Sequence, residues 1–355
     1  MKTLSHHFRI YAGGDVPKHS LSETRSETHP YPIFANALQN RGLYGFTSEQ
    51  RAKGNSLTIT ARGYLGHAEY RDEDFFPIVR LLVLEPTGDL DARFTTFAVN
   101  DRVKFAFEST GVPQLTAPQV GKYSVAAPPL PEQHAIAEAL SDVDALLAAI
   151  DQLIAKKRNL KQATMQQLLT GATRLPGFRG EWEVKTLGEL ALLYQPITIS
   201  ANKFTKDGYP VYGANGVVGC YHTPNHYSWQ VTVTCRGSTC GTINRTVDEC
   251  WITGNAMVLN CDNNSNLCKD FFYFLMLIQD LSNCITGTGQ PQIVRAPLMA
   301  FQVTLPIDIP EQTAIAEIFS EMDAEILALE ERRKKTAGIK QGMMQELLTG
   351  RVRLV

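Results

Sequence analysis

The amino-acid sequence predicts an α+β protein in which two mixed α/β domains alternate with two long helices that pair as an antiparallel coiled coil. Two segments of the chain repeat each other without a gap, and both carry a helical apolar period. The stretch before each segment instead contains short runs typical of β-strands. We therefore expect a tandem repeat with pseudo-twofold symmetry, divided into residues 1–128, 129–171, 172–308 and 309–355.

The repeat is the clearest feature of the chain. The segments that begin at Pro131 and Pro310 are offset by a constant 179 residues, and they are identical at 22 of 45 positions. Chance does not produce such a match, so the chain is two copies of one unit, each with a variable front part and a preserved back part. Because the back parts kept their length without an insertion, length itself is expected to matter.

Each back part is expected to form one long helix. Pro131 and Pro310 suit a first helical turn, and Gly171 and Gly350 suit the position just past a helix end. About 39 residues at ~1.5 Å per residue give a length on the order of 55–60 Å.

Apolar residues recur along both helices at alternating steps of four and three, which is the seam of a coiled coil and needs a partner helix. The two helices are each other's expected partner; two unrelated amphipathic helices on separate local cores are the alternative. The predicted interface residues are Ile136, Leu140, Val143, Leu147, Ile150 and Ile154 in the first helix and Ile315, Phe319, Met322, Ile326 and Leu329 in the second, where the pattern stops at Arg333.

The two front domains are expected to share a fold although their sequences have diverged. Strand-like runs occupy residues 57–61 and 77–84 in the first domain and 230–235 and 256–259 in the second. Short echoes relate them: Tyr-Pro-Ile-Phe-Ala-Asn at 31–36 resembles Tyr-Pro-Val-Tyr-Gly-Ala-Asn at 209–215, and Thr-Ile-Thr-Ala-Arg-Gly at 58–63 resembles Thr-Val-Thr-Cys-Arg-Gly at 232–237.

Composition narrows the class of protein. The 355 residues carry a formal net charge of −2, which excludes a polycationic nucleic-acid binder but leaves local DNA-binding surfaces open. All seven cysteines lie between Cys220 and Cys284 without a Cys-x-x-Cys pair, so we expect reduced thiols and no metal site. No apolar run is long enough to span a bilayer, and no secretory segment is visible. These features predict a cytoplasmic protein without a membrane role.

No motif for catalysis is found. The chain lacks a phosphate-binding loop and the Asn/Asp-Pro-Pro-aromatic tetrad of adenine methylases. Ser238 and Thr239 follow an Arg-Gly turn, yet no neighbouring motif supplies a base that would activate a nucleophile. We therefore expect no catalytic residues and no cofactor in this chain.

The motifs that open and close the helices carry a family resemblance. Pro-Leu-Pro-Glu-Gln at 129–133 and Ile-Pro-Glu-Gln at 309–312 open them, and Leu-Leu-Thr-Gly at 168–171 and 347–350 closes them. With the variable–helix–variable–helix order, the chain closely resembles the DNA specificity (S) subunit of type I restriction-modification systems.

The resemblance implies that each front part is a target recognition domain that reads one half of a bipartite, asymmetric site in double-stranded DNA. The helices would set the spacer between the half-sites and dock two methyltransferase (modification) subunits. Those subunits would hold S-adenosylmethionine and methylate adenine at N6. A restriction subunit, where the system has one, would add ATP- and Mg-dependent translocation and cleavage.

The candidate DNA contacts are Arg62, Arg236, Lys203, Lys206 and Asn215. Arg62 and Arg236 sit in equivalent glycine turns at strand ends, where a guanidinium could reach guanine or phosphate; alternatively, each closes its turn by pairing with a carboxylate. Gln114 and Gln292 also occupy equivalent places, and we interpret them as caps of the last domain strand rather than readers of adenine. The competing hypothesis for the whole chain is a coiled-coil interaction scaffold with two ligand-binding domains and no DNA role.

Overall fold

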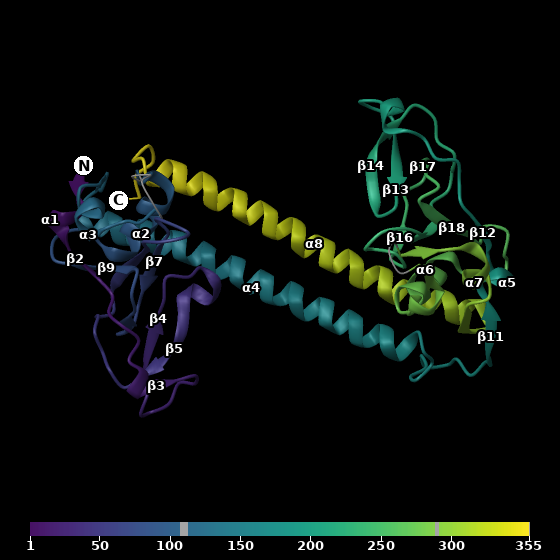
Figure 1. Cartoon of the computed structure of the whole chain (residues 1–355), viewed down its shortest axis with the longest axis horizontal. Helices are drawn as coiled ribbons and strands as arrows, with labels where there is room; N and C mark the ends of the chain where they lie inside the picture. The colour runs from purple at the N-terminus through teal and green to yellow at the C-terminus, as the bar shows by residue number, and fades with distance from the viewer. Residues whose placement is uncertain (107–112, 288–290, 355) are drawn as a thin grey trace. The chain divides into compact units, whose positions relative to one another are not determined.

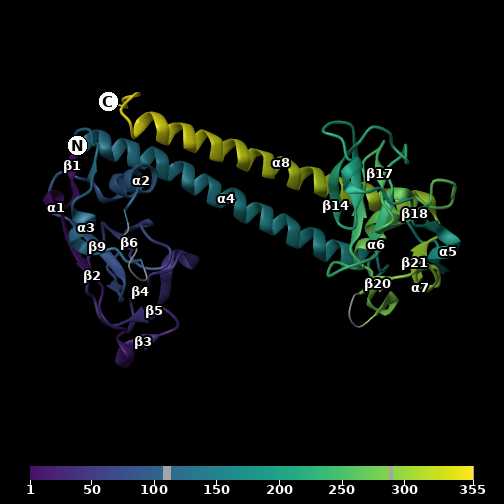
Figure 2. The ribbon, with the colours of Figure 1, turned by 45° about the horizontal axis from the view of Figure 1, so that its top comes forward.

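The computed structural model describes residues 1–106, 113–287 and 291–354. The chain divides into two compact units, one made of Met1–Asp151 and Glu331–Val355 and the other of Gln152–Glu330 (Figure 1). Two 39-residue helices, α4 (Leu130–Leu168) and α8 (Ile309–Leu347), each contribute to both units (Figure 2). The two predicted long helices are therefore present.

Unit 1 contains two four-stranded sheets. The first has the order β2-β9-β6-β7 and is antiparallel throughout; the second has the order β3-β5-β4-β8, with β4 and β8 parallel. The strands are β1 (Lys2–Thr3), β2 (Phe8–Ala12), β3 (Leu21–Ser22), β4 (Tyr31–Phe34), β5 (Leu43–Thr47), β6 (Ser56–Thr60), β7 (Ala68–Arg71), β8 (Phe76–Pro77), β9 (Leu81–Pro86) and β10 (Ser124–Val125). The short helices are α1 (Leu4–His7), α2 (Ala92–Arg102), α3 (Ala117–Gly121), η1 (Lys18–Ser20) and η2 (Gln39–Gly42).

Unit 2 repeats this plan. Its sheets have the orders β12-β18-β15-β16 and β14-β13-β17, with β13 and β17 parallel. The strands are β11 (Trp182–Thr186), β12 (Leu192–Tyr194), β13 (Tyr209–Gly213), β14 (Gly216–Tyr221), β15 (Val231–Thr234), β16 (Ile243–Arg245), β17 (Trp251–Ile252), β18 (Ala256–Asn260), β19 (Ile285–Thr286), β20 (Gln292–Ile293) and β21 (Gln302–Pro306). The helices are α5 (Leu187–Leu190), α6 (Lys269–Leu277), α7 (Arg295–Met299), η3 (Ala201–Lys203) and η4 (Ser282–Cys284). The four-stranded sheet β12-β18-β15-β16 repeats the order β2-β9-β6-β7, and β14-β13-β17 repeats β5-β4-β8. No counterpart of β3 occurs in this sheet among the described residues, and the divergent fronts otherwise share one fold.

The central strand of each unit is covered on both faces. All five residues of β6 and all four of β15 are buried. In unit 1, α2 packs on one face, where Phe94 joins Leu57 and Ile59, and Phe75 joins Val83 in the cluster on the other face. These strands therefore lack the alternation of a half-exposed sheet and read as short apolar or threonine-rich runs.

One predicted strand is wrong. Residues 77–84 form two strands in different sheets, β8 and β9, and the chain crosses between the sheets at Ile78–Arg80. Arg80 takes a left-handed conformation with φ 73°, and the Leu81 amide donates to the Ile78 carbonyl. The apolar run continues through this crossing because Ile78 remains buried, so periodicity alone could not show the break.

The helices pair antiparallel within each unit. In unit 1, Lys340 and Arg333 of α8 bind Asp144 and Asp151 of α4; in unit 2, Lys157, Arg158 and Lys161 of α4 bind Glu325, Glu330 and Asp323 of α8. Arg333, where the apolar pattern stops, thus meets a carboxylate. Of the predicted seam residues, Ile136, Leu140, Ile150, Ile154, Ile315, Phe319 and Ile326 are buried, and Val143, Leu147, Met322 and Leu329 are half-buried.

The repeated helix-opening and post-helix motifs meet in each unit. In unit 1, Glu132 accepts hydrogen bonds from Arg353, which follows α8; in unit 2, Glu311 accepts them from Arg174, which follows α4. The glutamine beside each glutamate binds the domain: Gln133 donates to the carbonyls of Asp89 and Pro128. The Pro-Glu-Gln motif therefore fastens a helix start both to its domain and to the segment after the partner helix.

Arg353→Gln should destabilise unit 1 at neutral pH and lose this effect in acid. Hydrogen bonds from Arg353 hold the pKa of Glu132 below its ordinary 4.5. A depressed carboxylate pKa stabilises the fold above the unfolded-state value and ceases to do so as pH falls through the folded-state value. Thermal melts at pH 7 and below pH 4 should show a difference in Tm between wild type and variant that narrows in acid.

The control is Arg351→Gln, which removes an exposed arginine that lies 3.5 Å from Glu346. An exposed pair of this kind contributes little, so its Tm should stay near that of the wild type at both pH values. Equal effects of the two substitutions would contradict a special role of the Glu132–Arg353 contact.

Candidate nucleic-acid interface

Two Arg-Gly turns occupy equivalent positions in the two units. Arg62–Gly63 follows β6 and leads to β7, and Arg236–Gly237 follows β15 and leads to β16. Gly63 and Gly237 have φ of 75° and 88°, the left-handed region that favours glycine. Among the described residues, nothing lies within 4 Å of the position that a Cβ would take on either glycine. Both turns are therefore open, with room for a ligand to approach the backbone.

Each turn arginine lies opposite a glutamine. Arg62 forms an antiparallel bridge with Gln114, and Arg236 forms the same bridge with Gln292. The residue after each glutamine donates its amide to the residue before the arginine: Leu115 to Ala61 and Ile293 to Cys235, both at 2.9 Å. Directly opposite residues of an antiparallel pair point to the same face, with Cβ atoms about 4.5–5.5 Å apart. Each unit thus presents an arginine and an exposed glutamine side by side.

In unit 1 a side chain binds the turn backbone, and in unit 2 the strand before the turn binds the β13–β14 hairpin. In unit 1 the Asn36 amide Nδ2 donates to the Arg62 carbonyl, and its Oδ1 accepts from the Ala61 amide at 2.6 Å. In unit 2 the Thr234 hydroxyl donates to the Ala214 carbonyl at the tip of the β13–β14 hairpin. Asn36 was not among the predicted site residues. The sequence did contain a signal for it, because Asn36 is the last residue of the segment 31–36 that resembles 209–215.

Neither turn arginine pairs with a carboxylate among the residues that the structure describes. No ion pair or side-chain hydrogen bond of Arg62 or Arg236 occurs within residues 1–106, 113–287 and 291–354, and Arg236 is exposed while Arg62 is half-buried. The alternative in which each arginine closes its turn by an ion pair therefore has no support in the described part of the chain.

The other candidate contacts fall in two places. Asn215 is exposed at the hairpin tip beside Ala214, close to the Arg236 turn through the Thr234 hydrogen bond. Lys203 and Lys206 are exposed near the other end of the same hairpin, where the Thr205 amide binds the Cys220 carbonyl. The structure therefore places Asn215 near the Arg236 turn. The two lysines lie near the far end of β14, several residues away at ~3.3 Å per residue.

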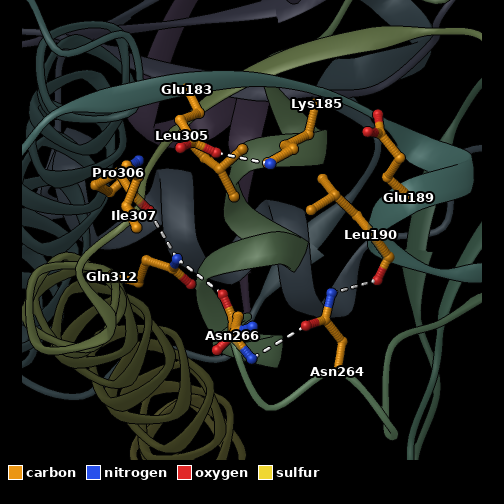
Figure 3. Close-up of a pocket in the computed structure, with 10 residues that line it drawn as sticks. All are labelled: Glu183, Lys185, Glu189, Leu190, Asn264, Asn266, Leu305, Pro306, Ile307 and Gln312. Atoms are coloured by element: carbon orange, nitrogen blue, oxygen red, sulfur yellow. Dashed lines mark hydrogen bonds and ion pairs between the residues drawn. The ribbon is translucent and has the colours of Figure 1, made fainter.

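A pocket of about 360 Å³ in unit 2 lies where β11, α5 and β21 meet the start of α8 (Figure 3). Its polar groups bind one another. Lys185 contacts Glu183 at 2.7 Å, Asn264 donates to the Leu190 carbonyl, and Gln312 donates to the Pro306 carbonyl at 2.8 Å. These three polar side chains are thus occupied by bonds to other residues of the pocket wall. The same bonds join the start of α8 to the domain.

Two of the buried cysteines are poorly suited to act as nucleophiles. Burial raises the pKa of Cys235 and of Cys261 to about 11, which keeps both thiols protonated at neutral pH. Among the described residues, no group of three or more His, Cys, Asp or Glu side chains is arranged to hold a metal ion. Within the same residues no helix is long and apolar enough to cross a membrane.

The fold and the two equivalent turns define a protein with two related α/β domains and two long paired helices. The family described as "Type I restriction modification DNA specificity domain" matches residues 3–157 and 179–339, so the chain belongs to this family. The resemblance stated from the helix motifs is confirmed.

Individual relatives agree with this assignment. The chain is 30% identical over 158 residues to a candidate type I specificity subunit of Mycoplasma pneumoniae, a stretch that covers 44% of this chain and 43% of that protein. It is 25% identical over 296 residues to the specificity subunit of the type I restriction enzyme MjaVIII from Methanocaldococcus jannaschii, which covers 71% and 67%. The chain thus spans less than half the length of the first of these proteins.

A solved structure shares the fold. The crystal structure of the S subunit of a type I restriction-modification system from M. genitalium has a TM-score of 0.73 at 18% identity, and the match covers 98% of this chain and 95% of that one. This confirms the predicted fold class, two repeated α/β domains with long paired helices.

Proposed function

We propose that this chain is the DNA sequence-specificity subunit of a type I restriction-modification complex. Each front domain reads one half of a bipartite, asymmetric site in double-stranded DNA, and the helices set the spacer. The observation that carries this proposal is the pair of domains with one strand order and one open Arg–Gln turn each, in sequences that have otherwise diverged. One fold with two different surfaces suits two different half-sites.

The helices also dock two methyltransferase subunits. Outside the seam, α4 exposes Leu153 and Leu160 seven residues apart in unit 2, with exposed fractions of 41% and 50%. Residues seven apart lie on one face of a helix, so these side chains form an apolar stripe that is not used within the unit. Exposed apolar stripes of this kind mark protein interaction surfaces.

The chemistry belongs to the partner subunits. S-adenosylmethionine, ATP and Mg act in the modification and restriction subunits, and this chain supplies recognition. With a formal net charge of −2, the isolated chain is expected to bind DNA weakly, because non-specific affinity comes from phosphate neutralisation. Phosphate contacts of the modification subunits would supply much of the affinity of the complex.

Exchange of residues 1–128 for the front domain of another specificity subunit should change one half-site and leave the other unchanged. The exchange retains the helices, so the spacer should stay the same as well. The measurement is methylation sequencing of host DNA after co-expression with the modification subunits, which reports both half-sites and the spacer. The donor domain must keep the backbone groups that Gln133 binds.

A modification subunit with an inactivated methylase motif is the control, and its DNA should carry no methylated motif. Absence of any sequence preference in the active complex would contradict the specificity role and favour the interaction scaffold. A change of both half-sites after exchange of one domain would contradict the division of labour between the domains.

A further inference from the structure

The two domains share one local structure at places where their sequences otherwise differ. Arg-Gly and the opposing glutamine occur in both turns, and both glycines have a left-handed conformation. The residues that follow differ entirely: Tyr64 and Leu65 in unit 1 against Ser238 and Thr239 in unit 2. The similarity that begins in the strand before each turn, at 58–63 and 232–237, thus ends at the glycine.

Side chains that both domains share should contact a part of the DNA that both half-sites share. If the domains read different base sequences, the base-reading side chains must differ between them. Two different DNA half-sites have the sugar-phosphate backbone in common, and contacts to it fix register and orientation without reading sequence. Arginine and glutamine both donate hydrogen bonds, as a phosphate oxygen requires.

The space beside both turns supports the same conclusion. Among the residues that the structure describes, nothing lies within 4 Å of the position that a Cβ would take on Gly63 or Gly237. In unit 1 Asn36 also binds the backbone of Arg62, which fixes the turn. With respect to these described residues, each glycine leaves room for a DNA strand to approach the turn.

We propose that Arg62 with Gln114, and Arg236 with Gln292, are two equivalent sites for DNA phosphate groups that set the register of each domain on the duplex and do not read bases. This inference rests on the proposed function, because it assumes that each domain meets a half-site. Phosphate, rather than guanine, is then the ligand of both arginines.

The test compares Arg62→Gln and Arg236→Gln in the complex with modification subunits. Binding is measured over a range of salt concentrations on a duplex with the methylated motif and on a duplex with both half-sites scrambled. Each substitution should make the slope of log K against log salt shallower by about 0.9, the value for one lost phosphate contact. The affinity for the two duplexes should fall by the same factor. Arg62→Lys should retain the slope, since lysine also binds phosphate.

Arg9→Gln is the matched control. Arg9 lies in β2, at the opposite edge of the sheet from β7, and pairs with Glu85 at 2.6 Å. The substitution Arg9→Gln removes the same charge as Arg62→Gln and should leave the slope of log K against log salt unchanged. Loss of affinity for the motif duplex alone, or failure of Arg62→Lys to restore binding, would show a base contact and overturn the inference. An unchanged slope would overturn it too, whereas absence of sequence preference in the wild-type complex would instead refute the proposed function.

Discussion

Gln312→Leu is expected to lower the free energy of unfolding by about 2–6 kcal/mol, because it leaves two buried backbone groups without partners at about 1–3 kcal/mol each. Gln312 is completely buried at the start of α8. Its Oε1 accepts from the Cys268 amide at 2.8 Å, and its Nε2 donates to the Pro306 carbonyl at 2.8 Å. Leucine has a similar volume but can satisfy neither group. Urea unfolding of the purified chain measures the effect.

The control on the same helix is Gln341→Leu, where the glutamine is exposed, and it should change the unfolding free energy by less than about 0.5 kcal/mol. Gln133→Leu should reproduce the loss in unit 1, since Gln133 accepts from the Asp91 amide at 2.9 Å as Gln312 does from Cys268. Retention of wild-type stability by Gln312→Leu would show that water or rearrangement replaces the lost bonds.

Phe319→Ala is expected to cost about 3–5 kcal/mol in the stability of unit 2, the range for a buried phenylalanine truncated to alanine. Phe319 is fully buried, and its ring centroid lies 5.3 Å from that of Phe274 in α6. The same core cluster contains Met165 and Leu168 of α4. One side chain therefore holds together the domain and both helices of the unit, and its loss leaves a cavity at their junction. Calorimetry of the wild type and the variant measures it.

Two further variants make this result specific. Phe319→Leu should recover most of the stability, because Leu140 fills the equivalent position of the repeat in unit 1. Leu327→Ala truncates a side chain of α8 that is 58% exposed and should have almost no effect on unfolding. Similar losses for Phe319→Ala and Leu327→Ala would indicate a general loss of helicity rather than a cavity.

Local sequence patterns predicted the helices, whose apolar residues recur at a fixed spacing, and the features that repeat between the two halves of the chain. The helices, their left-handed glycine ends at Gly171 and Gly350, and the shared fold of the fronts all follow from repeats and spacing. Contacts between distant residues were not predictable in this way. Glu132 and Arg353 are 221 positions apart, and nothing local to either residue indicates that they meet. The break between β8 and β9 was missed for a related reason, since a crossing between two buried sheets stays apolar.

In the candidate site, too, local patterns were predictable and distant contacts were not. Arg62 and Arg236 occupy equivalent positions in the two front sequences, and in the structure each forms an antiparallel β-bridge with a glutamine. The role of Asn36 depends on hydrogen bonds to a turn 26 residues away, which a sequence echo does not reveal. Lys203 and Lys206 are candidates because their charge suits phosphate, and charge does not determine which end of a hairpin a residue occupies.

The division of the chain has a consequence for the order in which the protein forms on the ribosome. Unit 2 is continuous, from Gln152 to Glu330, and all of its parts are present once that stretch has been synthesised. Unit 1 also needs Glu331–Val355, which supplies Leu347 and Leu348 to its core and Arg353 to Glu132. Domains usually fold in the order of their synthesis. Here unit 1 departs from that order, because part of its core stays uncovered until Glu331–Val355 has followed unit 2 in synthesis.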